Sequence, residues 1–162
     1  VSIDVHVGEG CISPYAIRRK ENLDGTVDSY KPRFRKQILK KIKNIGSEVD
    51  YEKLPDDPIV IKPRQFVLLT TNEYIQIPDF MVGFIVGKSS IARIGLSIEA
   101  ASIIQPGFGG NITLEVYNHS NMHITIHKGD PIGQLYFELL TSTAVPYTGK
   151  YQWQCGPTGS KG

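Results

Sequence analysis

The sequence predicts an all-β protein with a distorted β-barrel or jelly-roll architecture. A series of short apolar or alternating runs fills residues 59–139, and Gly, Pro, Asn or Asp interrupts them at short intervals. Many short strands joined by such turns are typical of antiparallel barrels, whereas a βαβ fold needs helical segments between its strands. Since the 162 residues contain no internal repeat, we expect one domain over residues 1–162.

The predicted elements follow the chain in order. Residues 2–8 alternate polar and apolar side chains and end at a glycine, which predicts a first strand. Residues 18–43 hold most of the basic groups, and apolar side chains at helical spacing over residues 34–45 predict a short helical insertion. A Pro-Asp-Asp-Pro break at residues 55–58 follows. Further strands are predicted at residues 59–61, 66–70, 74–77, 82–86, 97–100, 112–118, 124–126 and 131–139.

The last segment, residues 146–162, is polar and rich in glycine. It has too little apolar content to pack by itself. It is therefore either a disordered end or a C-terminal flap that becomes ordered over a ligand in the active site.

Composition excludes several classes of partner. Hydrophobic residues make up 40% of the chain and charged residues 21%, and the net charge is only +2. That charge is too small to predict nucleic acid or a membrane surface as the main partner. No apolar run approaches the ~20 residues that a spanning helix needs. Cys11 and Cys155 stand far apart, which favours free thiols and a cytoplasmic location.

Residues 87–93 concentrate groups that bind phosphate. Behind a glycine they carry one lysine, two hydroxyls and one arginine: Lys88, Ser89, Ser90 and Arg93. Such a cluster can hold several oxygens of a polyphosphate. The segment is not a P-loop, because the glycines of residues 83–89 are one residue too close and no strand–loop–helix pattern surrounds them. The alternative is a polar turn with a solvated lysine and arginine.

Glu115 is a single carboxylate inside the apolar run of residues 112–117. Strand alternation places Thr113, Glu115 and Tyr117 on one face, opposite the apolar side chains. An ionisable group in such a run costs free energy unless it is paired or used, so we interpret this face as the lining of a cleft. The alternative is that the face meets solvent and that Glu115 is an ordinary surface residue.

The segment just before Glu115 offers backbone donors. Residues 106–110 contain three glycines, which let backbone N–H groups approach a ligand, although a plain hairpin turn fits equally. The four histidines do not group with cysteines or carboxylates at zinc-binding spacing. The H-x-E and P-C-x-x-C signature of zinc deaminases is absent too. The sequence therefore predicts no zinc and no protein-held metal site.

Three ordered motifs resemble the dCTP deaminase family of the dUTPase-like superfamily. Residues 87–96 resemble its signature G-R-S-S-L-A-R-L-G-L, and residues 106–118 are similar to P-G-W-x-G-x-[IL]-x-L-E-x-x-N. Residues 146–147 and 149–158 are similar to the K-Y-x-x-Q-x-G ending, and residues 2–8 resemble the first strand. The match covers the opening strand and most of residues 59–161.

This resemblance implies a homotrimer of β-barrel subunits with deoxynucleotide sites between them. Glu115 matches the general acid/base of the family. Ser89 and Arg93 match residues that hold the catalytic water and tune that carboxylate. Lys88 and Ser90 match phosphate-binding positions, although the family usually has Arg where this chain has Lys88.

The resemblance also assigns the remaining site residues. Tyr147, Lys150 and Gln154 match the tail that closes over sugar and phosphates, and Mg²⁺ would arrive bound to those phosphates. Base recognition would fall to the backbone near Ala101, where the chain is one residue shorter than the family pattern. Gln105 stands where the family carries Asp. Its carboxamide can bond a deoxyribose hydroxyl, but it cannot act as the base for pyrophosphate hydrolysis.

We therefore expect a zinc-independent deoxycytidine nucleotide deaminase that converts dCTP and water to dUTP and ammonia. With no zinc ligands, one carboxylate, Glu115, must move the protons. Two alternatives stay open. One is a dUTPase, or a deaminase that also releases pyrophosphate. The other is a non-catalytic relative that binds nucleotides.

Overall fold

The computed structural model describes residues 2–13, 52–55, 57–98, 103–159 and 161. Within these ranges the chain is mostly strand, with one short helix, α2 (Ser89–Ala92). The strands are β1 (Ser2–His6), β2 (Ile12–Ser13), β3 (Glu52–Lys53), β4 (Ile59–Ile61), β5 (Phe66–Gln76), β6 (Met81–Gly87), β7 (Leu96–Ile98), β8 (Ile103–Ile104), β9 (Gly109–Asn118), β10 (Ile124–Ile126) and β11 (Pro131–Leu139). The all-β prediction is confirmed. The helical insertion predicted at residues 18–43 lies outside the described residues.

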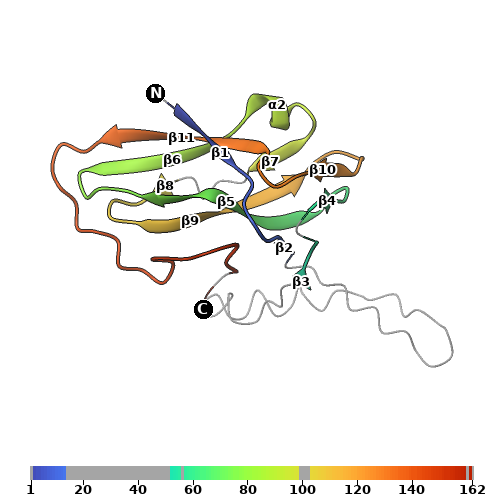
Figure 1. The fold of residues 1–162 in the computed structure, drawn as a ribbon. Coiled ribbons are helices and arrows are strands. Elements are labelled where there is room, and N and C mark those ends of the chain that lie inside the picture. Colours follow the sequence, from blue (N-terminus) through green and yellow to red (C-terminus); the bar gives the residue numbers. More distant parts are fainter. Residues whose placement is uncertain (1, 14–51, 56, 99–102, 160, 162) are drawn as a thin grey trace, which may run out of the picture.

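The described strands pair antiparallel in three sheets. One sheet has the order β1-β11-β6-β8, another has the order β3-β2-β5-β9-β7, and β10 pairs with β4. Figure 1 shows β6 and β11 in one layer and β5 and β9 in the other. Because β1 pairs with β11, the first and the last strand of the chain lie side by side in the first sheet. Such packed antiparallel layers match the predicted barrel or jelly-roll architecture.

The core lies between the layers and consists of aliphatic side chains. Those exposed by no more than 1% are Val5, Val7, Ile59, Ile61, Val67, Leu69, Ile77, Leu96, Leu114, Val116 and Ile132. In β9 the side chains alternate between buried and half-buried from Ile112 onward. This alternation places Thr113, Glu115 and Tyr117 on the outer face of β9, as the sequence predicted. Over the described ranges, no helix has the length and apolar character needed to cross a membrane.

Among the strands whose bounds differ from the prediction, β5 and β9 differ most. The sequence predicted separate strands at residues 66–70 and 74–77, but β5 is one continuous strand. A β-bulge between Thr70 and Tyr74 lets the polar residues between them stay in the strand. The strand predicted at residues 112–118 begins earlier, because Gly109 and Gly110 already pair with the end of β5. Gly109 and Gly110 of the predicted glycine turn therefore belong to strand β9.

Asn118 is fully buried at the end of β9 and joins the end of β4 to the loop that follows β9. Its Nδ2 donates to the carbonyls of Ile61 (3.0 Å), Lys62 (3.1 Å) and Met122 (2.8 Å). Its Oδ1 accepts from the backbone N–H of Ser120 (2.9 Å) and from the Ser120 hydroxyl (2.7 Å). One side chain thus satisfies several backbone groups that the strands do not pair.

Candidate active site

A pocket of about 470 Å³ lies over the outer face of β9 and contains Glu115. Its lining combines apolar walls with a few polar groups: Phe66, Leu68, Ile103, Ile104, Gln105, Phe108, Ile112, Thr113, Glu115, Tyr147, Tyr151, Gln154 and Thr158. The structure therefore brings four predicted site residues together: Gln105, Glu115, Tyr147 and Gln154. Apolar walls with a few convergent polar groups are typical of small-molecule sites.

Glu115 is the one carboxylate among the described residues that line this pocket. It is half-buried, and in the ladder it stands opposite Leu68 of β5. Burial raises the pKa of Glu115 above its ordinary value, and a hydrogen bond with its own backbone offsets part of that rise. A carboxyl group that holds its proton more firmly is suited to give and take protons near neutral pH.

The tail, which the structure describes over residues 146–159, lies along β9 and borders the pocket (Figure 1). The backbone N–H of Trp153 donates to the Gly109 carbonyl at 2.7 Å. Gly110 and Gln154 form a parallel bridge, in which the Asn111 N–H donates to the Gln154 carbonyl at 3.0 Å. The Gln154 side chain returns a hydrogen bond to the Asn111 carbonyl at 2.8 Å. The tail is therefore paired with the same strand that carries Glu115.

Gln154 brings an unsatisfied acceptor to the pocket. Its Nε2 is engaged by Asn111, but its Oε1 is buried and has no hydrogen-bond partner among the described residues. Thr113, on the same face as Glu115, accepts from the backbone N–H of Thr158 at 3.1 Å. Since a buried acceptor without a donor costs free energy, Gln154 can accept a hydrogen bond from a ligand.

The predicted phosphate-binding cluster stands elsewhere in the chain. Its residues lie in or beside α2, and none lines the pocket: Lys88, Ser89, Ser90 and Arg93. Figure 1 shows α2 and the tail on opposite sides of the molecule. The two serines and the arginine are exposed, while the Lys88 Nζ lies 2.5 Å from Oδ2 of Asp4. One chain alone does not bring this cluster to Glu115.

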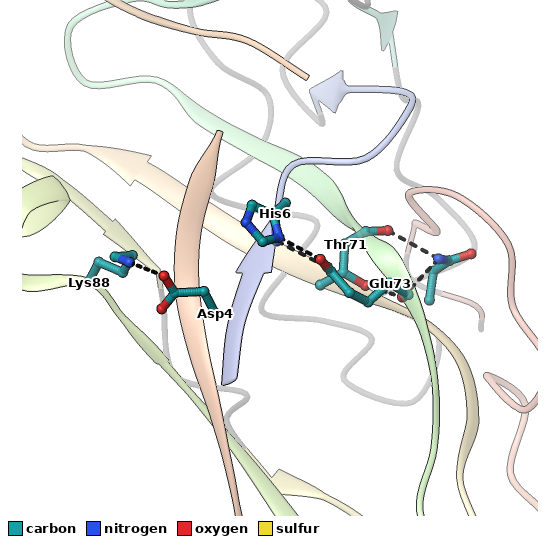
Figure 2. A network of polar contacts seen from close by, with 6 residues as sticks. Asp4, His6, Thr71, Glu73 and Lys88 are labelled. Carbon is teal, nitrogen blue, oxygen red and sulfur yellow. Dashed lines mark hydrogen bonds and ion pairs between the residues drawn. The ribbon is translucent and has the colours of Figure 1, made fainter. Parts of the chain in front are cut away.

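A polar network joins β1 to the bulge of β5 and to the start of β9 (Figure 2). The backbone N–H of His6 donates to Glu73 at 3.0 Å, and the His6 Nδ1 lies 2.6 Å from the other carboxylate oxygen. The Thr71 hydroxyl donates to the Glu73 carbonyl at 2.9 Å. The Asn111 Nδ2 donates to the carbonyls of Thr71 (3.1 Å) and Glu73 (3.0 Å). The network fixes the part of β9 that the tail contacts.

Two further predicted residues are not placed at the pocket. The Lys150 Nζ donates to the Lys161 carbonyl and lies 5.5 Å from the centroid of the Tyr151 ring. Ala101 lies outside the described residues.

Sequence reasoning also missed lining residues. Tyr151 could have been found, because it directly follows Lys150 in the tail motif, whereas the wall formed by Phe66 depends on the pairing of β5 with β9.

A larger pocket of about 640 Å³ contains none of the predicted site residues. It lies between the start of the chain and the end of the tail, where Cys11 and Cys155 both line it. Cys11 is buried and Cys155 is exposed, and neither forms a disulfide among the described residues. In the part of the chain that the structure describes, no group of three or more His, Cys, Asp or Glu is placed to hold a metal ion.

The chain is similar to known proteins over most of its length. Residues 1–140 match the family described as dCTP deaminase-like. A relative from Sulfurihydrogenibium sp. (strain YO3AOP1), named dCTP deaminase, dUMP-forming, is 42% identical over 136 residues, which cover 83% of this chain and 69% of the relative. A relative of the same name from Persephonella marina (strain DSM 14350 / EX-H1) is 47% identical over 107 residues, 65% of this chain and 59% of the relative. In that alignment the chain spans about three-fifths of the relative's length.

The fold also resembles a solved structure. The 2'-deoxycytidine 5'-triphosphate deaminase from Agrobacterium tumefaciens superposes with a TM-score of 0.55 at 17% sequence identity. The superposition covers 85% of this chain and 39% of that protein. At this identity the likeness concerns the fold alone.

Proposed function

Because the chain belongs to the dCTP deaminase-like family, we propose that it is an enzyme that hydrolyses the exocyclic amine of a deoxycytidine nucleotide. One observation carries the proposal. Glu115 lies half-buried in a largely apolar pocket of about 470 Å³, with its pKa raised by burial. The names of the similar proteins support dCTP as the substrate.

The proposed chemistry requires one proton shuttle. Water adds to C4 of cytosine while N3 gains a proton. Ammonia then leaves as the C4 carbonyl forms. Glu115 takes the proton of the attacking water and delivers protons to the ring nitrogen and the departing amine. General acid–base catalysis of this kind contributes ~10²–10⁴-fold to the rate. In this proposal the water is activated without zinc.

The pocket also offers groups that would orient the nucleotide. The apolar walls suit the faces of a base, and Gln105 can hydrogen-bond a deoxyribose hydroxyl. Tyr147 and Gln154 hold the tail side of the pocket, so we assign residues 146–162 as a flap that closes over sugar and phosphates. The closed flap would exclude water and fix the reacting geometry. Recognition by the backbone of Ala101 and phosphate binding by Lys150 stay predictions.

A second copy of the chain would complete the site. Ser89 and Arg93 are exposed and belong to α2 or its C-terminal end, and α2 lies on the far side of the molecule from the tail (Figure 1). We therefore assign their catalytic contact with Glu115 to a neighbouring subunit of a homotrimer. Lys88 and Ser90 of that neighbour would bind the phosphates. Mg²⁺ belongs to the substrate in this scheme, because it is bound by the phosphates of the nucleotide.

Two products are compatible with this site. The carboxamide of Gln105 and the single pocket carboxylate favour dUTP, since the described residues that line the pocket include no second carboxylate to activate water for pyrophosphate loss. The names of the relatives, dUMP-forming, favour a second candidate function in which pyrophosphate is also released. A third possibility is a relative that binds nucleotides without turning them over.

One experiment separates these functions. The purified protein is incubated with dCTP and with dUTP in separate reactions containing Mg²⁺, and the products are resolved by ion-exchange chromatography. Ammonia with dUTP supports the first candidate, and ammonia with dUMP and pyrophosphate supports the second. Binding of dCTP without any product would overturn the assignment of an enzyme.

A further inference from the structure

Trp153 rests on Gly109 in a geometry that no larger residue at position 109 would allow. A Cβ atom added to Gly109 would lie 2.1, 2.6 and 2.9 Å from three atoms of the Trp153 indole, and these are its three nearest neighbours. The φ angle of Gly109 lies outside the left-handed region, so its backbone would accept alanine. The indole of Trp153 can therefore occupy this position only because Gly109 has no side chain.

The backbone of Trp153 is also unusual. Its φ angle of 60° lies in the left-handed region, which residues other than glycine rarely adopt. Such a conformation persists where surrounding contacts fix it. Trp153 is 55% exposed, so burial in the core does not hold it. The hydrogen bond to the Gly109 carbonyl and the packing of the ring on Gly109 are contacts that help to fix this conformation.

Gln152, the residue before Trp153, also holds the tail against the glycine turn. The Gln152 carboxamide donates from Nε2 to the Gly107 carbonyl at 2.8 Å and accepts from the Gly109 N–H at 3.0 Å. Gln152 thus pairs with the backbone of the glycine turn much as a strand would. Gln154 follows with its bridge to Gly110, so three consecutive tail residues are docked on one turn.

We propose that Trp153 is a positioning residue: the seating of its indole on Gly109 docks the tail and so holds Tyr147 and Gln154 at the pocket. Trp153 does not line the pocket itself. Trp153 therefore fixes the position of the tail, and the tail in turn contacts the substrate. This inference deepens the proposed function and rests on it only for its kinetic consequences.

Docking can be measured without substrate, because Trp153 is the single tryptophan of the chain. Quenching of its fluorescence by acrylamide reports how freely the indole meets solvent. Gly109→Ala should raise the quenching constant about twofold by displacing the ring, and Gln152→Ala should raise it without adding volume. Gly87→Ala is the matched control, since its φ lies outside the left-handed region and the added Cβ would meet its nearest atoms at 3.9–4.0 Å, and it should leave quenching unchanged.

Kinetics then link docking to the substrate. Gly109→Ala should raise KM for dCTP about tenfold with a smaller fall in kcat, because the tail loses its hold on bound substrate. In a Trp153→Gly background, where the ring is gone and glycine suits the left-handed backbone, adding Gly109→Ala should change KM no further. Urea unfolding of each variant shows whether the fold is retained.

Two results would overturn the proposal. One is unchanged quenching in both Gly109→Ala and Gln152→Ala. The other is a rise in KM on Gly109→Ala that is equally large with and without the indole of Trp153. If the wild type shows no turnover of dCTP, the proposed function fails, but the quenching measurements still decide whether Trp153 docks the tail.

Discussion

The Nζ atom of Lys88 lies 2.5 Å from Oδ2 of Asp4 and ties the residue before α2 to strand β1 (Figure 2). The hydrogen bond from Lys88 lowers the pKa of Asp4, with a further hydrogen bond from Gln134 acting in the same direction. A lysine assigned to phosphate is thus already paired with a carboxylate of its own chain. Asp4 and a phosphate would compete for the same ammonium group.

This pairing predicts opposite effects for its two partners. Lys88→Ala should raise KM for dCTP about tenfold, because a cation that binds phosphate is lost. Asp4→Asn should lower KM by about threefold, since the lysine is released from a competing charge. Steady-state kinetics at low salt measure both. If Asp4→Asn weakened binding as much as Lys88→Ala, the pair would be a structural clamp instead.

Glu115→Gln tests the proton shuttle. Glutamine keeps the size of the side chain but cannot carry the proton, so ammonia release should fall by at least about 10²-fold. Binding of dCTP, measured by calorimetry, should stay within about threefold of the wild type. The exposed Glu138 of β11 offers a control, and Glu138→Gln should keep its activity. Turnover at the wild-type rate in Glu115→Gln would eliminate Glu115 as the shuttle.

The same carboxyl predicts a pH dependence of stability. Burial raises the folded-state pKa of Glu115 above its ordinary value of 4.5, so the folded protein holds this proton to higher pH than the unfolded chain does. The stabilisation of the folded state by this proton is fully present below pH 4.5, and it is lost as pH rises through the folded-state pKa of Glu115.

Thermal unfolding of wild type and Glu115→Gln from about pH 4 to about pH 8 measures this loss. The Tm of Glu115→Gln minus the Tm of the wild type should increase as pH rises across this window. A constant difference between the two Tm curves would show that the carboxyl titrates alike in the folded and unfolded states.

Removal of residues 149–162 tests the flap. The truncated chain loses Gln154 and the pairing of the tail with β9, while the strands of both layers remain. We expect kcat/KM for dCTP to fall at least about tenfold, because the open site no longer excludes water. Circular dichroism and gel filtration should show an unchanged β-sheet signal and oligomeric state. An unchanged rate would mean that the tail is not a lid.

Asn118 predicts a purely structural effect. Asn118→Ala leaves the carbonyls of Ile61, Lys62 and Met122 without their donor, which should cost about 1–3 kcal/mol in the free energy of unfolding. Urea denaturation measures this change. Asn72→Ala is a suitable control because Asn72 is exposed, and its effect should stay within about 0.5 kcal/mol.

Much of the strand pattern followed from the sequence. The bounds of β4, β10 and β11 agree with the predicted ranges, since turn residues flank short apolar runs there. The bulge that joins the two predicted halves of β5 was missed. The polar residues between the halves have the composition of a turn, whereas contacts with distant residues, among them His6 and Asn111, keep them in the strand. A local pattern carries no information about such distant partners.

The sequence by itself determined the all-β class and the outward face of Glu115, because the period of two in a strand is a local property of the chain. The tertiary structure decided what that face meets. The register that sets Glu115 opposite Leu68 joins segments far apart in the sequence, and so does the pairing of Gln154 with Gly110. The same packing places α2 away from the tail, although its residues precede β9 by only a short segment. Long-range register depends on how the two layers pack, and that packing is a property of the whole chain.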